Sequence, residues 1–243
     1  MNNKEIINTG MTNISYREGN IFVQEKIYKK FNHKIDYQIL EKLDFVPKLL
    51  SNEKEMCKWE FINGSEPILN DENICKIAKL IKKTHDSKLH FPASNHAARV
   101  KEYRKILSQK NINIPVLNDF YRNVNTTLSK MDKSIPLHND LWVRNIIVDN
   151  NDKIFFCDWE YASMGDIHFD LAYFIESADL NKDQEKLFLD SYGWHNELHL
   201  LRHKILVNYL IVLWVHCQEK IHFSTKEYEN RIYKYGEQLK KYQ

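Results

Sequence analysis

The sequence predicts an α+β fold with two lobes, a small β-rich N-terminal lobe and a larger, mainly helical C-terminal lobe. In residues 1–63, short apolar runs alternate with turn residues, a pattern that is typical of strands. From Asp71 onward, apolar residues recur at the 3.6-residue period of an α-helix. We therefore divide the chain into residues 1–64 and residues 65–243. With 243 residues, 43% of them hydrophobic, the chain is long enough to bury a proper core.

The N-terminal lobe is expected to begin with a hairpin. Residues 13–16 and residues 21–26 read as strands, and between them lies the turn Arg17-Glu18-Gly19-Asn20. Further along we expect a short helix over residues 35–43, which ends before Pro47, and a strand over residues 56–62.

The C-terminal lobe is expected to begin with an amphipathic helix at Asp71. Its apolar positions fall on one face, Asn70 is a suitable cap, and the acidic first turn suits the positive helix start. Strong turn residues at 149–152 separate two short strands that interrupt the helices. These strands cover residues 145–148 and 153–157, and the further helices cover residues 97–109, 117–131, 170–177, 182–192, 197–220 and 225–242.

Composition excludes several classes of protein. The net charge is only +2, from 35 basic and 33 acidic side chains, so we expect neither a nucleic-acid nor a membrane partner. The four cysteines form no CxxC pair, which favours a reducing compartment over a disulfide framework. The longest apolar stretch, residues 205–215, is too short to span a bilayer, and the polar N-terminus is no signal peptide. The histidines show no HExxH pattern, so no zinc is expected, and we predict a soluble, cytoplasmic protein.

One segment carries the residues of phosphoryl-transfer chemistry. His138 and Asp140 form a His-x-Asp pair, followed after four residues by Asn145, and Asp158 comes thirteen residues later. Phosphoryl transfer needs a carboxylate beside the attacking hydroxyl and oxygen ligands for magnesium. Asp140 fits the first role, and Asn145 and Asp158 fit the second, because the predicted hairpin between them brings them together.

Each of these residues has a plainer interpretation when taken alone. An aspartate near a turn is usually a helix cap or a solvated loop residue. His138 is expected to brace the loop and not to take part in the reaction. The joint pattern of four residues with a hairpin between the last two is far more specific than any single member.

The same segment resembles a known family. Residues 137–172 read His-Asn-Asp-Leu-Trp-x-x-Asn, Asp-Trp-Glu-Tyr-Ala and Gly-Asp-x-x-Phe-Asp-Leu-Ala, which is similar to the choline kinase and aminoglycoside phosphotransferase superfamily. Within it, the chain looks most like bacterial choline kinases that supply phosphocholine for surface glycoconjugates. Weaker matches include residues 10–13, similar to the phosphate-covering loop, residues 61–64, similar to the hinge after the adenine site, and residues 81–85.

The resemblance implies a bilobal protein-kinase-like fold and an ATP-dependent phosphotransferase. It makes Asp140 the catalytic base and Asn145 and Asp158 the Mg²⁺ ligands, with Glu160 near the metal and Asp170 bracing the loop. The expected nucleotide contacts are Gly10, Met11, Thr12, Asn13, Lys26, Glu60, Phe61 and Ile62.

The N-terminal lobe departs from the family pattern at one position. Where these kinases carry a basic residue for the α- and β-phosphates, the simplest alignment places Gln24. Lys26 lies two residues on, on the same strand face, and either binds the phosphates or is a solvated lysine at a strand end. The acidic partner on the following helix is Asp36 or Glu41.

The acceptor is expected to be a small amino alcohol, most of all choline. A quaternary ammonium has no N–H to donate, so it calls for aromatic faces and a nearby carboxylate. Choline kinases often carry two tryptophans three residues apart, whereas this chain has Ile211 and Trp214. The expected acceptor contacts are Glu160, Tyr173, Glu176, Trp214 and Tyr228.

Two kinds of alternative stay open at this stage. Ethanolamine, thiamine or an aminoglycoside could replace choline as the acceptor, although an aminoglycoside site needs more carboxylates than the segment around residues 173–192 offers. A nucleotide-binding pseudokinase scaffold is the alternative from another class, and only the uncertain role of Lys26 favours it. The sequence leaves the oligomeric state open.

Overall fold

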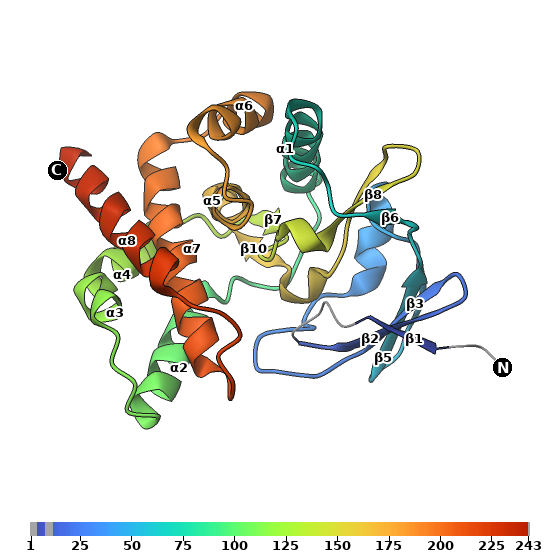
Figure 1. Ribbon diagram of the computed structural model, residues 1–243, viewed down its shortest axis with the longest axis horizontal. Helices are drawn as coiled ribbons and strands as arrows, with labels where there is room; N and C mark the ends of the chain where they lie inside the picture. The colour runs from blue at the N-terminus through green and yellow to red at the C-terminus, as the bar shows by residue number, and fades with distance from the viewer. Residues whose placement is uncertain (1–3, 8–11, 243) are drawn as a thin grey trace.

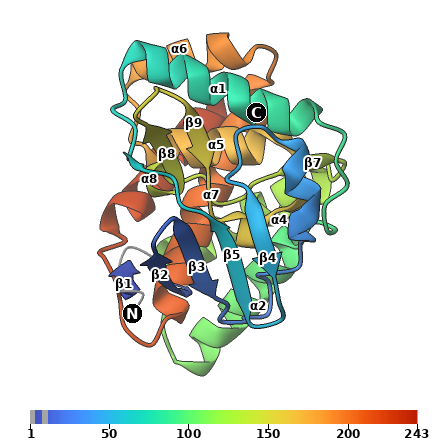
Figure 2. The same ribbon diagram turned by 90° about the vertical axis from the view of Figure 1, so that its right-hand side faces the viewer.

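The computed structural model describes residues 4–7 and 12–242. Its N-terminal part is an antiparallel sheet of five strands in the order β1-β2-β3-β5-β4. Figure 1 shows this sheet at one end of the molecule and most helices at the other, and Figure 2 shows the sheet from its own end. The strands are β1 (Lys4–Ile7), β2 (Ile14–Glu18), β3 (Ile21–Glu25), β4 (Leu49–Asn52) and β5 (Met56–Glu60).

The predicted hairpin forms the middle of this sheet. Ile14 pairs with Glu25 and Glu18 pairs with Ile21, so β2 and β3 are joined by two residues. One of them, Gly19, has φ +60°, a left-handed conformation that glycine adopts without steric cost. The expected helix over residues 35–43 is instead the 3₁₀ helix η1 (Tyr37–Lys42), capped by the side chain of Asp36.

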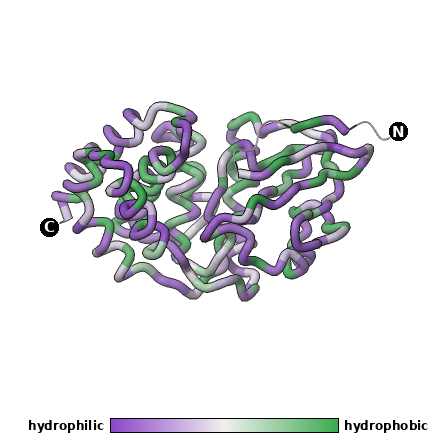
Figure 3. The backbone as a smooth tube through the Cα atoms, turned by 90° about the horizontal axis from the view of Figure 1, so that it is seen from below, coloured by the Kyte–Doolittle hydropathy of each residue, from purple (hydrophilic) through white to green (hydrophobic). Residues whose placement is uncertain are grey.

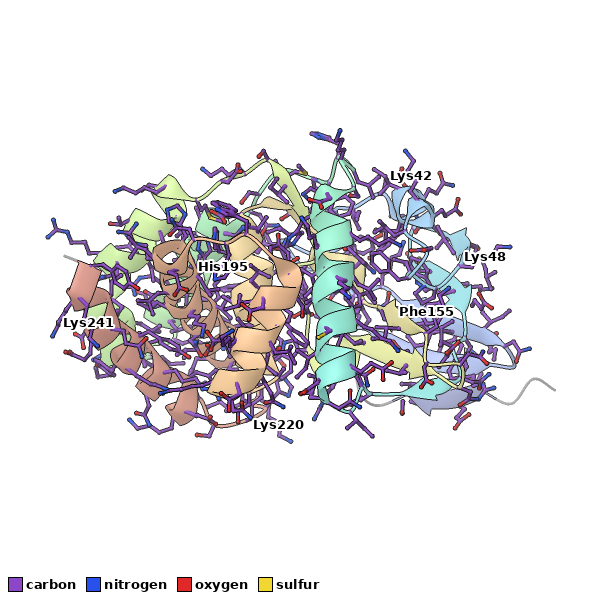
Figure 4. The ribbon with its side chains drawn as sticks, turned by 90° about the horizontal axis from the view of Figure 1, so that it is seen from above. Lys42, Lys48, Phe155, His195, Lys220 and Lys241 are labelled. Atoms are coloured by element: carbon purple, nitrogen blue, oxygen red, sulfur yellow. The ribbon has the colours of Figure 1, made fainter. Side chains whose placement is uncertain are left out.

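Helices make up most of the C-terminal part. Figure 4 shows α1 between the strand side, where Lys48 and Phe155 lie, and the helical side with His195 and Lys241. Figure 2 shows α1 and α6 running side by side, and the two helices are in contact. The helices are α1 (Asp71–Asp86), α2 (His96–Gln109), α3 (Pro115–Asp119), α4 (Tyr121–Lys130), α5 (Ile167–Ser177), α6 (Lys182–Tyr192), α7 (Glu197–Cys217) and α8 (Lys226–Leu239).

Helix α7 forms the centre of this part. It packs against α2, α4, α5 and α8, and Figure 3 shows apolar stretches running through the middle of the helical half. By length and composition, α7 could cross a membrane, with a mean hydropathy of 1.3 over its most apolar window, but 78% of that window is buried inside the protein. It is therefore a core helix.

Two further small sheets are present among the described residues. The strand β8 (Ile146–Asp149) pairs with β6 (Gly64–Ser65) on one side and with β9 (Ile154–Phe156) on the other. A second pair consists of β7 (Ile135–Leu137) and β10 (Ser163–Gly165). Between them run the short 3₁₀ turns η2 (Val143–Asn145) and η3 (Trp159–Tyr161), while η4 (Lys240–Tyr242) follows α8.

The predicted fold class is confirmed, and the differences are local. The single helix expected over residues 117–131 is broken at Phe120, whose ψ of 3° interrupts the helical path between α3 and α4. The sequence analysis missed β1, β4, β6, β7 and β10, which have at most four residues each and therefore show little alternation. The division of the chain after residue 64 stays a prediction.

Candidate active site

The loop that follows β7 is held by one buried carboxylate. Asp170, on α5, accepts the backbone N–H groups of His138 and Asn139, each at 2.8 Å. His85 Nε2 lies 3.3 Å from the same carboxylate. These contacts keep the pKa of Asp170 below its usual value although burial opposes ionisation. The predicted role of Asp170 as a brace matches this geometry.

The residue just before Asp140 is in a strained conformation that its neighbours fix. Asn139 has φ +67°, which asparagine tolerates better than most residues. Its Nδ2 donates to Ser163 Oγ at 2.8 Å, and its Oδ1 lies 2.9 Å from His96 Nε2. The loop is thereby fixed at the point where it presents Asp140.

The predicted hairpin brings Asn145 next to Asp158. Ile146 pairs with Phe156, and the N–H of Cys157 donates to the carbonyl of Asn145 at 2.8 Å. The side-chain nitrogen of Asn145 donates to the Asp140 carbonyl at 2.7 Å and lies 3.3 Å from its carboxylate. The three side chains line one pocket, as the sequence analysis expected.

The carboxylates of Asp140, Asp158 and Glu160 lie close together in the site. Burial, with repulsion from Glu160 and Asp140, raises the pKa of Asp158 well above its ordinary value. Burial also raises the pKa of Asp140 to about 6, against the hydrogen bond donated by the Tyr173 hydroxyl to its Oδ1. Such a group of like charges is most stable with a cation among them.

Glu160 gives a test of whether a metal fits here. Its Oε2 accepts hydrogen bonds from Asn13 and Asn32, both at 2.9 Å, and lies 3.0 Å from His33 Nε2. Its Oε1 is buried and has no hydrogen-bond partner within residues 4–7 and 12–242. An unsatisfied oxygen beside Asp158, with the amide oxygen of Asn145, forms an oxygen donor set of the kind that Mg²⁺ prefers. The residues present therefore fit this ion.

Two pockets meet at Asn145 and Asp158. The first, which we call the acceptor pocket, also contains Asp140 and has the aromatic walls Trp142, Tyr161, Phe169, Tyr173, Trp214 and Phe223. The second, which we call the nucleotide pocket, lies against the sheet and includes Gln24, Trp59, Glu60, Phe61, Ile62 and Phe156.

Comparison with known proteins decides the family. A family model described as choline/ethanolamine kinase matches residues 21–211.

The chain belongs to the choline/ethanolamine kinase family.

Two curated relatives and one solved structure illustrate the match. A LicA homolog of Metamycoplasma hominis is 48% identical over 98% of each chain, and one of Mycoplasma capricolum is 44% identical over 96% of this chain and 98% of the relative. The structure of the choline kinase LicA from Streptococcus pneumoniae superposes with a TM-score of 0.76 at 20% identity, covering 98% of this chain and 95% of the other. The protein is a phosphotransferase that acts on choline-like substrates.

In this kinase, Lys26 does not enter the nucleotide pocket. Its Nζ donates to Asn52 Oδ1 at 2.5 Å and to the Glu53 carbonyl at 2.7 Å, in the turn between β4 and β5. Gln24 instead lines the pocket and donates to Asp158 at 3.3 Å. The expected phosphate contact of Lys26 therefore needs correction, because β3 ends at Glu25 and the side chain beyond it turns to the neighbouring strands.

Glu176 is also not where the sequence analysis expected it. It is buried between α5, α7 and α8, and it does not line the acceptor pocket. It accepts hydrogen bonds from Tyr235 at 2.7 Å and Asn208 at 2.8 Å, and the cations of Arg231 and Lys204 lie 3.4 and 3.8 Å away. Its charge is thus compensated within the core, and no acceptor contact remains for it.

The other expected contacts that lie within the described residues divide into four groups. Tyr173, Trp214 and Thr12 line the acceptor pocket, while Glu60, Phe61 and Ile62 line the nucleotide pocket. Tyr228 does not line the acceptor pocket, but its ring lies 5.9 Å from that of Phe223, which does. Glu160 and Asn13 bond to one another beside the catalytic carboxylates. Gly10 and Met11 lie outside the described residues.

Several residues that line the pockets were not predicted, among them Gln24, Trp142, Phe223 and Arg99. Gln24 was noted only as a departure from the basic residue that the family carries there. Trp142 lies inside the motif that contains Asp140 but was given no role. Phe223 carries no signal in the sequence. Arg99, on α2, is buried, and its guanidinium lies 4.9 Å from the centre of the Tyr161 ring. Trp142 could have been found from its place two residues after Asp140.

Proposed function

We propose that this kinase transfers the γ-phosphoryl group of ATP to the hydroxyl of choline, giving phosphocholine and ADP. The observation that carries the proposal is a single pocket that holds the Asp140 carboxylate and a wall of aromatic rings. A trimethylammonium group binds to aromatic faces, and its hydroxyl needs an adjacent carboxylate. The names of the relatives, one of them a choline kinase, support the same acceptor.

Asp140 acts on the acceptor in this proposal. Its Oδ2 side lies beside Asn145, and its Oδ1 receives the Tyr173 hydroxyl, so the carboxylate is held in one orientation. Held there, Asp140 orients the choline hydroxyl and accepts its proton as the phosphoryl group arrives. Tyr173 is in turn held by the indole N–H of Trp142, so both side chains position the base and form part of the wall.

The nucleotide occupies the second pocket. Phe61 and Ile62 follow β5, where an adenine ring would lie against apolar side chains, and the phosphates would extend toward Asp158. Asn145, Asp158 and the free oxygen of Glu160 would hold Mg²⁺, which when bound neutralises the charge of the triphosphate. The free thiols of the four cysteines fit a cytoplasmic location.

The position of Glu176 favours choline over acceptors with a primary ammonium group. Ethanolamine and aminoglycosides present N–H donors that need acceptor groups in the site. With Glu176 bound in the core, the carboxylates that line the acceptor pocket, among the residues the structure describes, are Asp140 and Asp158, which belong to the catalytic centre. A quaternary ammonium makes no such demand and gains from the aromatic wall.

A coupled assay of ADP release with equal concentrations of choline, ethanolamine, thiamine and kanamycin tests the proposal. We expect the highest kcat/KM with choline, because its head group suits the aromatic wall. A higher value with ethanolamine or thiamine would overturn choline as the acceptor and leave the phosphotransferase activity in place. Release of ADP that no acceptor increases would overturn the function as a whole.

A further inference from the structure

A cluster of one carboxylate and three imidazoles lies outside both pockets. Asp166 and His168 come from the start of α5, and His199 and His203 lie one turn apart on α7. Atoms of Asp166, His168 and His199 that could bind a metal all lie within 4.8 Å of one another. We call these four residues the Asp166 cluster. The sequence analysis expected no zinc because it found no ligand motif, but the fold brings together histidines from two helices.

The buried side chain of His203 has one nitrogen without a hydrogen-bond partner in the described part of the chain. Its side chain is 2% exposed, and its Nδ1 donates to the carbonyl of His199 at 2.7 Å. The neutral ring therefore carries its lone pair on Nε2, which has no hydrogen-bond partner within the described residues and lies 3.8 Å from Asp166 Oδ2.

A buried lone pair facing a carboxylate oxygen is unfavourable unless a cation lies between them. Asp166 retains acceptor capacity for it: Oδ1 receives His168 and Oδ2 receives the N–H of Asp132, and a carboxylate offers about four lone-pair sites.

We propose that the Asp166 cluster is a binding site for a transition-metal ion of the zinc class, separate from the catalytic centre. Asp166 supplies one oxygen, and His199 and His203 supply nitrogens, an N₂O set that a water completes to the tetrahedral geometry of Zn²⁺. Zn–N and Zn–O distances of about 2.0–2.2 Å require the ligand atoms to move closer together, within the reach of side-chain rotation. His168 keeps the hydrogen bond that its Nδ1 donates to Asp166 and thereby orients the carboxylate.

The surroundings allow a metal to enter and to be held. His199 is only half-buried, so the cluster is reached from solvent on that side. The N–H of Asn196 donates to His168 Nε2 at 2.8 Å, so both nitrogens of this ring are engaged and His168 serves as an outer partner of the ligand Asp166. The bound ion would tie the start of α5 to α7.

Titration of the full chain with Zn²⁺ at pH 7 tests the site. The protein carries no oligohistidine tag, is first treated with a chelator, and has the Asp158→Asn substitution, so that the catalytic centre does not take the metal. We expect one Zn²⁺ per chain, a higher melting temperature, and tetrahedral absorption when Co²⁺ replaces Zn²⁺.

Two histidine variants complete the test. His199→Ala removes a half-buried ligand and should weaken binding by at least about tenfold. His195→Ala is the matched control, because this neighbouring histidine is outside the cluster, and it should bind Zn²⁺ as the parent does. No stoichiometric binding by the parent, or equal affinity in the parent and the His199→Ala variant, would overturn the proposal.

Discussion

The loop that presents Asp140 and the end of strand β3 are both parts of the same site, but they are built differently. The loop is held by buried hydrogen bonds to Asp170 and to the side chain of Asn139. At the end of β3, one hydrogen bond of 3.3 Å joins Gln24 to Asp158, and Lys26 turns away to the neighbouring turn. The difference teaches that the C-terminal part fixes Asp140 and Asn145, while the N-terminal part lines the nucleotide pocket and holds Glu160 through hydrogen bonds from two asparagines.

The largest effect is expected from removing the brace of the loop. Asp170→Ala leaves two buried N–H groups and His85 without their acceptor, which should cost about 3–5 kcal/mol of unfolding free energy. Urea denaturation measures this loss. Asp190→Ala, at an exposed ion pair, is the control and should change the unfolding free energy by less than about 1 kcal/mol. An equally small effect of Asp170→Ala would remove the contrast between the two regions.

A smaller effect is expected in the acceptor pocket. Trp214→Ala removes one aromatic wall, and the lost cation–π contact of about 0.5–2 kcal/mol should raise the KM for choline by about 2–30-fold. The value of kcat should change less, because no hydrogen bond joins Trp214 to Asp140 within the described residues. Steady-state kinetics with choline as the varied substrate measures both constants. An unchanged KM would show that the cation binds elsewhere.

The buried histidines around the loop should make stability depend on pH. Burial lowers the pKa of His138 to about 4 and that of His96 to about 3, whereas both rings titrate near 6.5 in the unfolded chain. The two neutral rings contribute fully to the free energy of unfolding above pH 6.5, and this contribution falls as the pH decreases toward 4. The slope of the free energy against pH then approaches the value for about two protons bound on unfolding. Urea denaturation from pH 7 to 4.5 measures the slope.

Two substitutions separate the contribution of His96 to this slope from that of the rest of the chain. His96→Gln should reduce the slope by about one proton, while His90→Gln, at an exposed position, should leave it unchanged. Equal slopes in the two variants would contradict a neutral, buried His96.

The smallest effect is expected at Lys26. Lys26→Ala should leave the KM for ATP within about twofold of the parent, because its ammonium group bonds to an exposed turn. Gln24→Ala, on the same strand, should raise that KM more, since Gln24 lines the nucleotide pocket. An increase of the KM for ATP in Lys26→Ala that exceeds the increase in Gln24→Ala would restore the role that the sequence favoured for the lysine.

The parts of the site that the sequence could predict are those set by short spacing. Asp140 and Asn145 are five residues apart, and a tight hairpin returns the chain to Asp158, so local turn chemistry determines their geometry. The misplaced residues depend on distant partners. The negative charge of Glu176 is compensated by Arg231 and by other side chains of α7 and α8, and no local sequence pattern predicts such a contact.

The fold shows the same division. The start of the long periodic helix α1 at Asp71 was predicted to the residue, because its apolar face is visible in the sequence. The strands β7 and β10 have three residues each, and only their pairing across the site defines them. The Asp166 cluster joins two helices and was hidden for the same reason.

Turnover of the Asp140→Asn variant tests the central claim most directly. Asparagine keeps the shape of the side chain but cannot accept the proton of the choline hydroxyl, so choline-dependent ADP release should fall by about 10²–10⁴-fold while the melting temperature is retained. The matched variant Asp149→Asn, in the hairpin turn outside the acceptor pocket, should keep most of the activity. Full choline-dependent turnover by Asp140→Asn would contradict the account, because the reaction would then need no base at this position.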